Sequence, residues 1–230
     1  MLPLRDNIPA RHYPVINVGI IAANIAIFIF EWRLGGHMEP FIRQWGFVPA
    51  RFQDGGLEPM AVSTIFTSMF LHGSLFHVLS NMWILWIFGD NVEDLMGHGG
   101  YMIFYLLCGV ASVFTQYWSA PGSVYPMVGA SGAIAGILGA YFLSFPKAKI
   151  LTLLPFFFLF YMVEVPAYFF LGVWFLLQFI QGSIVLIGAS HLPEGGIAWW
   201  AHVGGFAGGI LLLPVFRKRS RRKRPSSLHF

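Results

Sequence analysis

The chain has 230 residues, of which 57% are hydrophobic and only 10% are charged, with a formal net charge of +4 and a mean hydropathy of +0.67. Soluble domains usually carry about 25% charged residues. This composition, with its long apolar runs, excludes an ordinary soluble domain and indicates a polytopic helical membrane protein. The single cysteine, Cys108, excludes an intrachain disulfide and a cysteine-based metal site.

Along the chain, three regions are expected. Residues 1–14 are polar and proline-rich, which indicates a cytoplasmic N-terminal segment rather than a cleavable signal peptide. Residues 15–216 are expected to form an all-α membrane domain of six transmembrane helices, and residues 217–230 a basic cytoplasmic tail. The predicted spans are 15–31, 75–89, 100–118, 131–145, 165–187 and 197–216.

The fourth of these spans is unusually short. Its fifteen or so residues give roughly 22 Å of helix at 1.5 Å per residue, less than the ~30 Å hydrocarbon core. We therefore expect a central fourth helix that begins below the membrane surface, preceded by a loop that dips inward against protein.

The apolar segment 150–187 is long enough for two helices. Pro155, Glu164 and Pro166 favour a break, so we predict one span from about residue 165, preceded by an apolar interfacial loop.

The distribution of basic residues predicts the orientation. With six spans, eleven Lys and Arg lie on the side of the termini, seven of them in the tail RKRSRRKR, and only Arg33, Arg43 and Arg51 lie opposite. Cytoplasmic segments of membrane proteins carry the excess of positive charge, so both termini are expected to be cytoplasmic. The tail is expected to contact anionic inner-leaflet lipid and not nucleic acid.

Spans two, four and six run in the same direction, so their first turns lie at one depth. These turns contain His77 and Asn81, then Ser131, then His202. Small residues recur every four positions after Ser131 and around His202, which lets two helices pack closely; they are Gly132, Gly136 and Ala140, then Ala201, Gly205 and Gly209. A hydroxyl, an imidazole and the free N–H groups of a helix N-terminus are the three parts needed for acyl transfer.

Each signal has a structural alternative. A serine at a helix N-terminus is most often an N-cap, and glycine repeats usually mean packing alone. His77 and Asn81, one turn apart, could be hydrogen-bonding contacts between helices, and His202 could line a proton or metal path.

Four motifs resemble the rhomboid family. GASG at residues 129–132 is similar to its Gly-x-Ser-Gly motif, and HVLSN at residues 77–81 to the His-x-x-x-Asn of its second span. AHVGGFAGG, from residue 201, resembles the catalytic-histidine segment, and WGFVPARF at residues 45–52 resembles the first external loop of bacterial members.

The resemblance implies an intramembrane serine protease with a Ser–His dyad, without a cofactor or metal, that cuts transmembrane protein substrates. The likeness of residues 45–52 to bacterial members implies a bacterial inner membrane. The resemblance also implies Ser131 as nucleophile and His202 as general base. The oxyanion hole would combine the Ser131 N–H with His77, Asn81 and the Gly129 backbone.

Two further residues match the family less strongly. His72 corresponds to a polar residue at the mouth of the site, or is simply a surface histidine before a Ser74 N-cap. Glu93 corresponds to a glutamate after the second span that would hold loop backbone.

One position departs from the pattern. Some members carry a tyrosine four residues after the nucleophile, stacked on the imidazole, where this chain has Ala135. Another residue must then orient the His202 ring, with Trp199, Trp200 or Phe206 as candidates. The competing functions are a non-catalytic rhomboid-like protein that binds membrane clients and a transporter lined by histidines.

Overall fold

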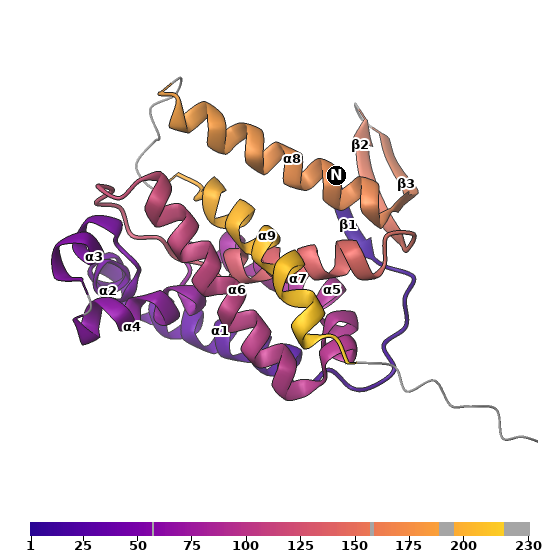
Figure 1. Ribbon diagram of the computed structural model, residues 1–230, viewed down its shortest axis with the longest axis horizontal. Coiled ribbons are helices and arrows are strands. Elements are labelled where there is room, and N and C mark those ends of the chain that lie inside the picture. Colours follow the sequence, from indigo (N-terminus) through magenta and orange to yellow (C-terminus); the bar gives the residue numbers. More distant parts are fainter. Residues whose placement is uncertain (57, 157–158, 189–195, 219–230) are drawn as a thin grey trace, which may run out of the picture.

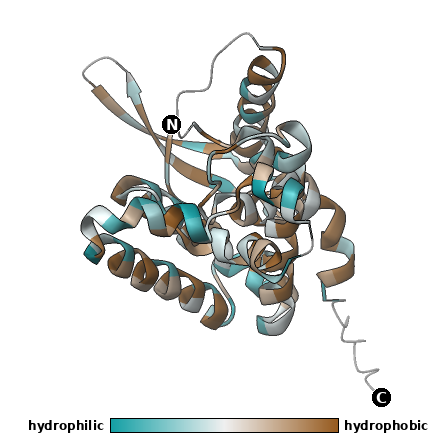
Figure 2. Cartoon of the chain, turned by 90° about the vertical axis from the view of Figure 1, so that its left-hand side faces the viewer, coloured by the Kyte–Doolittle hydropathy of each residue, from teal (hydrophilic) through white to brown (hydrophobic). Residues whose placement is uncertain are grey.

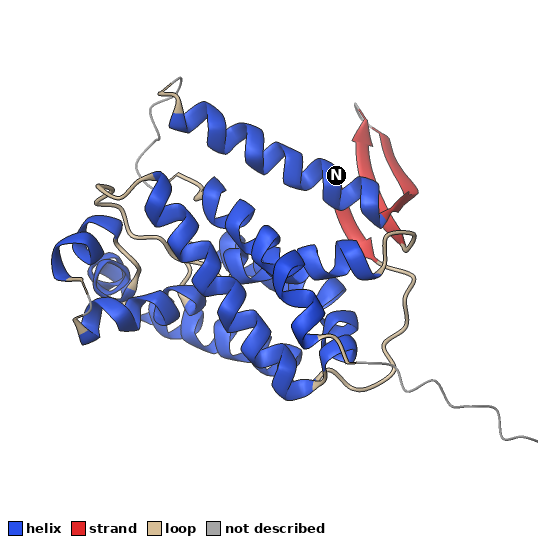
Figure 3. Cartoon of the chain, viewed as in Figure 1, coloured by secondary structure: helices blue, strands red, loops and turns tan. Residues whose placement is uncertain are grey.

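The computed structural model describes residues 1–56, 58–156, 159–188 and 196–218. Figures 1 and 3 show a bundle of helices with one small sheet at its edge. The long helices are α1 (Val15–Arg33), α5 (Leu75–Met96), α6 (His98–Ser119), α7 (Ser131–Ser144), α8 (Ala167–Leu186) and α9 (Trp199–Phe216). Between α1 and α5 lie α2 (Met38–Trp45), α3 (Pro49–Gly55) and α4 (Pro59–Thr67), with 3-10 turns η1 (Gly35–His37) and η2 (Ser68–Phe70).

Four helices of the described chain are long and apolar enough to cross a membrane, namely α1, α6, α8 and α9. Figure 2 shows much of the helical bundle in brown, the colour of hydrophobic residues. The pair formed by Pro59–Phe70 and α5 is bent by 76°, and it gives a fifth candidate crossing if the two helices are counted as one span. The mostly helical, multi-pass membrane fold is thus confirmed, while the count of six spans stays a prediction.

Helix α7 is the short central helix that the sequence predicts. It has 14 residues, and every residue from Gly132 to Tyr141 is buried. In Figure 1 it lies among α5, α6, α8 and α9, all of which contact it. Glycine and alanine on α7 leave little side-chain volume, so its neighbours approach its backbone closely.

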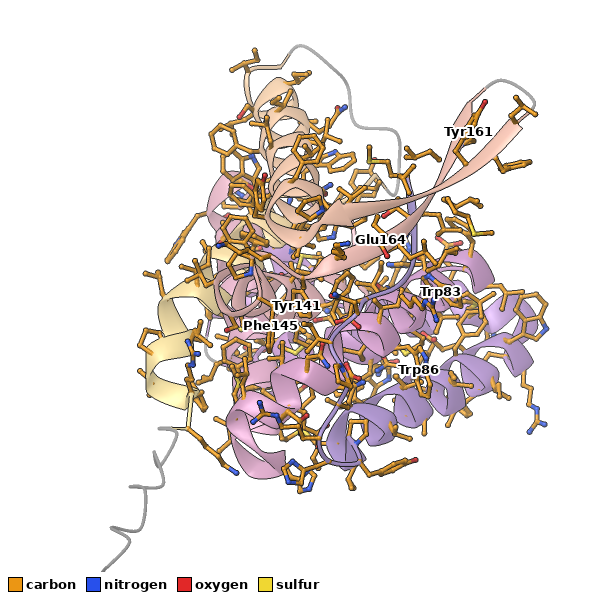
Figure 4. All side chains as sticks on the ribbon, turned by 90° about the vertical axis from the view of Figure 1, so that its right-hand side faces the viewer. Trp83, Trp86, Tyr141, Phe145, Tyr161 and Glu164 are labelled. Carbon is orange, nitrogen blue, oxygen red and sulfur yellow. The ribbon has the colours of Figure 1, made fainter. Side chains whose placement is uncertain are left out.

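The segment before α8 is not the loop that we predicted from the sequence. It forms a β-hairpin of β2 (Lys149–Phe156) and β3 (Leu159–Pro166), which the strand β1 (Leu2–Arg5) extends in the order β1-β2-β3. Figure 4 shows the hairpin leaving the helices, with Tyr161 toward its tip and Glu164 nearer its base. The aromatic and β-branched residues of this segment favour extended backbone. Its pairing with β1, at the other end of the chain, could not be predicted from the local sequence. The break at Pro166, which precedes the single helix α8, agrees with the prediction.

Residues 1–14 are expected as a polar segment, and the structure shows that they are held against the helices. Trp83 Nε1 donates to the Pro3 carbonyl at 2.7 Å, and the Tyr141 hydroxyl donates to Asp6 Oδ2 at 2.5 Å. Burial raises the pKa of the Asp6 carboxyl, and the Tyr141 hydrogen bond opposes that shift. The N-terminal segment, which includes β1, is therefore hydrogen-bonded to both α5 and α7.

Glu93 lies inside α5, because this helix continues to Met96 instead of ending near residue 89. Its carboxylate accepts hydrogen bonds from the backbone N–H groups of Ile16 at 3.0 Å and Asn17 at 2.8 Å. These amides belong to the first turn of α1, where backbone N–H groups have no acceptor within the helix. The N-terminus of a helix also favours a negative charge nearby. Glu93 thus holds a helix N-terminus, rather than the backbone of a loop. The basic tail lies outside the described residues from 219 onward.

Candidate active site

Ser131 is the first residue of α7, and Ala130 occupies the N-cap position. The Ser131 hydroxyl makes no cap hydrogen bond and lies 2.8 Å from His202 Nε2. The N-cap alternative is therefore wrong for this serine. The helix N-terminus still places unpaired backbone N–H groups beside the hydroxyl, where negative charge is favoured.

Close packing of α7 on α9 brings the serine and the histidine together, although they are 71 residues apart. A Cβ atom added at Gly205 would lie 1.9 Å from the Gly132 carbonyl oxygen. One added at Gly209 would lie 2.0 Å from the Gly136 carbonyl oxygen. The two helices therefore touch backbone to backbone, and no larger residue fits at either position.

We expect Gly209→Ala to lower the free energy of unfolding by about 1–3 kcal/mol, because the added methyl group meets backbone atoms that have no rotamer to change. Gly172→Ala in α8 is the matched control, since its Cβ would lie 3.9 Å from the nearest atom, a Phe142 ring carbon. Thermal unfolding in detergent micelles measures both variants. Equal stability of the two would contradict the close contact of α7 with α9.

His77 and Asn81 lie on α5, facing the turn before Ser131. Gly129 in this turn has φ +122°, and a Cβ there would lie 2.7 Å from the His77 ring and 3.7 Å from Asn81 Nδ2. Asn81 is buried, and its Nδ2 has no hydrogen-bond partner among the described residues. This leaves a donor beside Ser131 without a partner, which does not fit a contact that merely joins two helices.

The Gly129 backbone is a correction to the expected oxyanion donors. Its N–H donates to the Ser68 carbonyl oxygen at 2.9 Å and is not free for another acceptor. What Gly129 contributes is space, because any side chain there would displace the His77 ring.

His72 is fully buried, so its reading as a surface histidine is wrong. Its ring meets the His77 ring edge to face with centroids 5.0 Å apart, and the two carboxylate oxygens of buried Glu31 accept from its backbone N–H at 3.3 and 3.2 Å. The Ser74 N-cap is present, with its hydroxyl accepting from the His77 N–H at 3.2 Å. No pattern in the sequence predicts that Glu31, near the C-terminal end of α1, lies against His72.

The His202 ring is oriented by residues of α8 that the sequence analysis missed. Gln178 Oε1 lies 2.7 Å from His202 Nδ1, and the Trp174 ring lies 5.9 Å from the imidazole. Of the three candidates named from the sequence, Trp199 contacts the imidazole edge to face, with ring centroids 6.5 Å apart. The other two have different partners: Trp200 donates to the Gly182 carbonyl oxygen, and Phe206 stacks on Phe175. A signal was available, since Gln178 is one of the few polar side chains in apolar α8, and such side chains often form hydrogen bonds to neighbouring helices.

The external-loop motif lies next to the turn that carries the serine. Phe47 and Met127 exchange two backbone hydrogen bonds, at 3.1 and 2.7 Å, and Phe47 is fully buried. Ser131 lies four positions after Met127, so the external loop contacts the segment that leads into α7. Among the described residues, no group of three or more His, Cys, Asp or Glu could hold a metal ion.

These features define a multi-pass helical membrane protein with a serine–histidine pair at the start of a short, buried central helix. The chain matches the Rhomboid domain family over residues 59–219, and it belongs to that family.

Its relatives carry the same family name. It is 35% identical over 142 residues to the mitochondrial presenilin-associated rhomboid-like protein of Bos taurus, covering 60% of this chain and 36% of that protein. It is 29% identical over 169 residues to mitochondrial rhomboid protein 1 of Saccharomyces cerevisiae, covering 72% and 45%. It is 37% identical over 76 residues to rhomboid protease GluP of Bacillus subtilis, covering 33% and 14%. The matched region thus spans about a third of the length of the first of these relatives.

Proposed function

We propose that this chain is an intramembrane serine protease that hydrolyses peptide bonds in or near the transmembrane segments of membrane proteins. The observation that carries the proposal is the 2.8 Å contact of the Ser131 hydroxyl with His202 Nε2 at the N-terminus of a buried helix. Membership of the rhomboid family, in which GluP bears the name of a protease, supports it.

In the proposed reaction, Ser131 Oγ attacks the scissile carbonyl carbon while its proton passes to His202 Nε2. The carbonyl oxygen becomes negative and is stabilised by the Ser131 backbone N–H and the side chains of Asn81 and His77. The protonated His202 then gives its proton to the leaving amine. A water molecule, deprotonated by His202, hydrolyses the acyl-enzyme and restores the serine.

The partners proposed are transmembrane protein substrates and, at the basic tail, anionic inner-leaflet lipid. We further propose that both termini are cytoplasmic, which rests on the excess of Lys and Arg on the side of the termini. The proposed bacterial inner membrane rests only on the likeness of residues 45–52 to the first external loop of bacterial members.

A fluorophosphonate probe tests the proposed function, because it reacts with an activated serine hydroxyl and not with an ordinary one. We expect covalent labelling of the purified protein in detergent, and none in Ser131→Ala. Ser144→Ala is the matched control, since Ser144 lies at the opposite end of the same helix. Labelling that persists in Ser131→Ala, or is absent from the native protein, would refute an activated Ser131. A non-catalytic client-binding protein would give the second of these outcomes.

A further inference from the structure

Gln178 joins α8 to the catalytic histidine. Its side chain is 7% exposed, and its Oε1 lies 2.7 Å from His202 Nδ1. A carbonyl oxygen only accepts hydrogen bonds, so Nδ1 carries the proton in this contact. Nε2 of the neutral ring then bears the lone pair and lies 2.8 Å from the Ser131 hydroxyl, which donates to it.

We propose that Gln178 is a positioning residue of the dyad, which selects the tautomer of His202 that can take a proton from Ser131. The inference rests on the proposed protease function and adds a third, uncharged member to it. In the soluble serine proteases an aspartate does this work, and loss of its acceptor leaves the wrong tautomer. No carboxylate touches the His202 ring among the residues that the structure describes.

Two features of the surroundings support the assignment. Trp174 lies one helical turn before Gln178 on the same face of α8, so both residues reach the imidazole from one helix. A buried amide in an apolar helix is costly unless it is paired, and the contact with Nδ1 is the pairing that offsets this cost.

An uncharged acceptor has a chemical consequence. It orients the ring as an aspartate would, but it supplies only a dipole to the imidazolium that forms when His202 accepts the serine proton. The titratable side chain that faces His202 from another described helix is His77, while Gln116 of α6, which accepts from the Ala201 N–H at 3.2 Å, is also neutral. Gln178 therefore orients His202 without adding a charge beside it.

Three variants separate positioning from packing. Gln178→Leu keeps the approximate volume and removes the acceptor; Gln178→Glu keeps an acceptor and adds a charge. Gln181→Leu is the matched control, because Gln181 is an exposed glutamine one turn further along α8. Initial rates on a fluorogenic transmembrane peptide give kcat and KM across pH. Nitrogen-15 spectra of labelled histidine, assigned against His202→Ala, report which ring nitrogen carries the proton.

We expect Gln178→Leu to lower kcat about 10- to 100-fold with KM unchanged, which corresponds to the loss of one buried hydrogen bond. Its His202 spectrum should lose the pure Nδ1–H signature. Gln178→Glu should recover most of the rate and keep the Nδ1–H signature, because a carboxylate oxygen at this position still accepts from Nδ1. Gln181→Leu should match the native protein in all readouts.

Native tautomer and native kcat in Gln178→Leu would overturn the proposal. So would an equal loss of activity in Gln178→Glu and Gln178→Leu with the Nδ1–H signature intact in both, because that pattern indicates packing alone. The spectra need no activity. Failure of the native protein to react with the fluorophosphonate probe would instead count against the protease function itself.

Discussion

Ser131→Ala and His202→Ala should each abolish proteolysis of a transmembrane substrate, with residual activity at or below about one part in 10⁴ of the native rate. The hydroxyl and the imidazole are 2.8 Å apart and act as one unit, so removing either one removes the same proton transfer. The double variant should then be no slower than either single variant. Cleavage of a purified substrate in detergent and in liposomes measures the three rates.

Folding must be kept apart from chemistry in this experiment. Both truncations remove polar groups from closely packed helices and leave α7 against α9, so their unfolding temperatures should stay near the native value. Ser144→Ala in the last turn of α7 and His37→Ala in the exposed turn η1 serve as controls, and both should retain full activity. Appreciable cleavage by purified Ser131→Ala or His202→Ala would refute the dyad.

Asn81→Ala should lower kcat about 10²–10³-fold, the usual cost of removing one donor from an oxyanion hole, with little change in KM. In the described structure Asn81 Nδ2 is buried without a partner. An unpaired buried donor costs stability, so its removal should leave the unfolding temperature unchanged or raise it. A variant that is slower and at least as stable distinguishes a donor held ready for the oxyanion from a residue that holds the fold.

His77→Ala should also lower kcat, by up to the same factor, because its ring lies against Gly129 beside Ser131. The two losses need not be equal, since the Ser131 backbone N–H shares the negative charge. Ser80→Ala is the control on the same helix, because Ser80 is exposed and its hydroxyl binds only the His77 carbonyl oxygen. Full turnover in both Asn81→Ala and His77→Ala would show that neither side chain serves the oxyanion.

Local patterns in the sequence predicted the helices and several features of the candidate site. The periodic small residues around Gly136 and Gly209 allowed one prediction from spacing alone, that α7 and α9 approach each other. The direction of the spans placed Ser131, His202 and His77 at one depth. The small-residue pattern depends on residues within one or two turns of each other, and small residues at every fourth position usually mark a close contact between membrane helices.

The features that the sequence did not predict depend on contacts between segments far apart in the chain. The hairpin of β2 and β3 pairs with Leu2–Arg5, and Glu93, in the part of α5 that the sequence did not predict, binds the first turn of α1. Neither partner can be found from the local sequence, because an apolar run with prolines fits a loop or a strand equally well. The Gly129 N–H was also predicted as an oxyanion donor, but in the structure it donates to the Ser68 carbonyl oxygen.

The sequence by itself determined the class of the protein, the family resemblance and the residues of the proposed dyad. Each of these follows from composition, periodicity or a short motif, which the chain carries without reference to its fold. Only the tertiary structure decided what orients the imidazole, because Gln178 and Trp174 reach His202 through the packing of α8 on α9. A hydrogen bond of 2.7 Å depends on the placement of two helix backbones to within a fraction of an ångström, and that placement results from all the contacts in the bundle together.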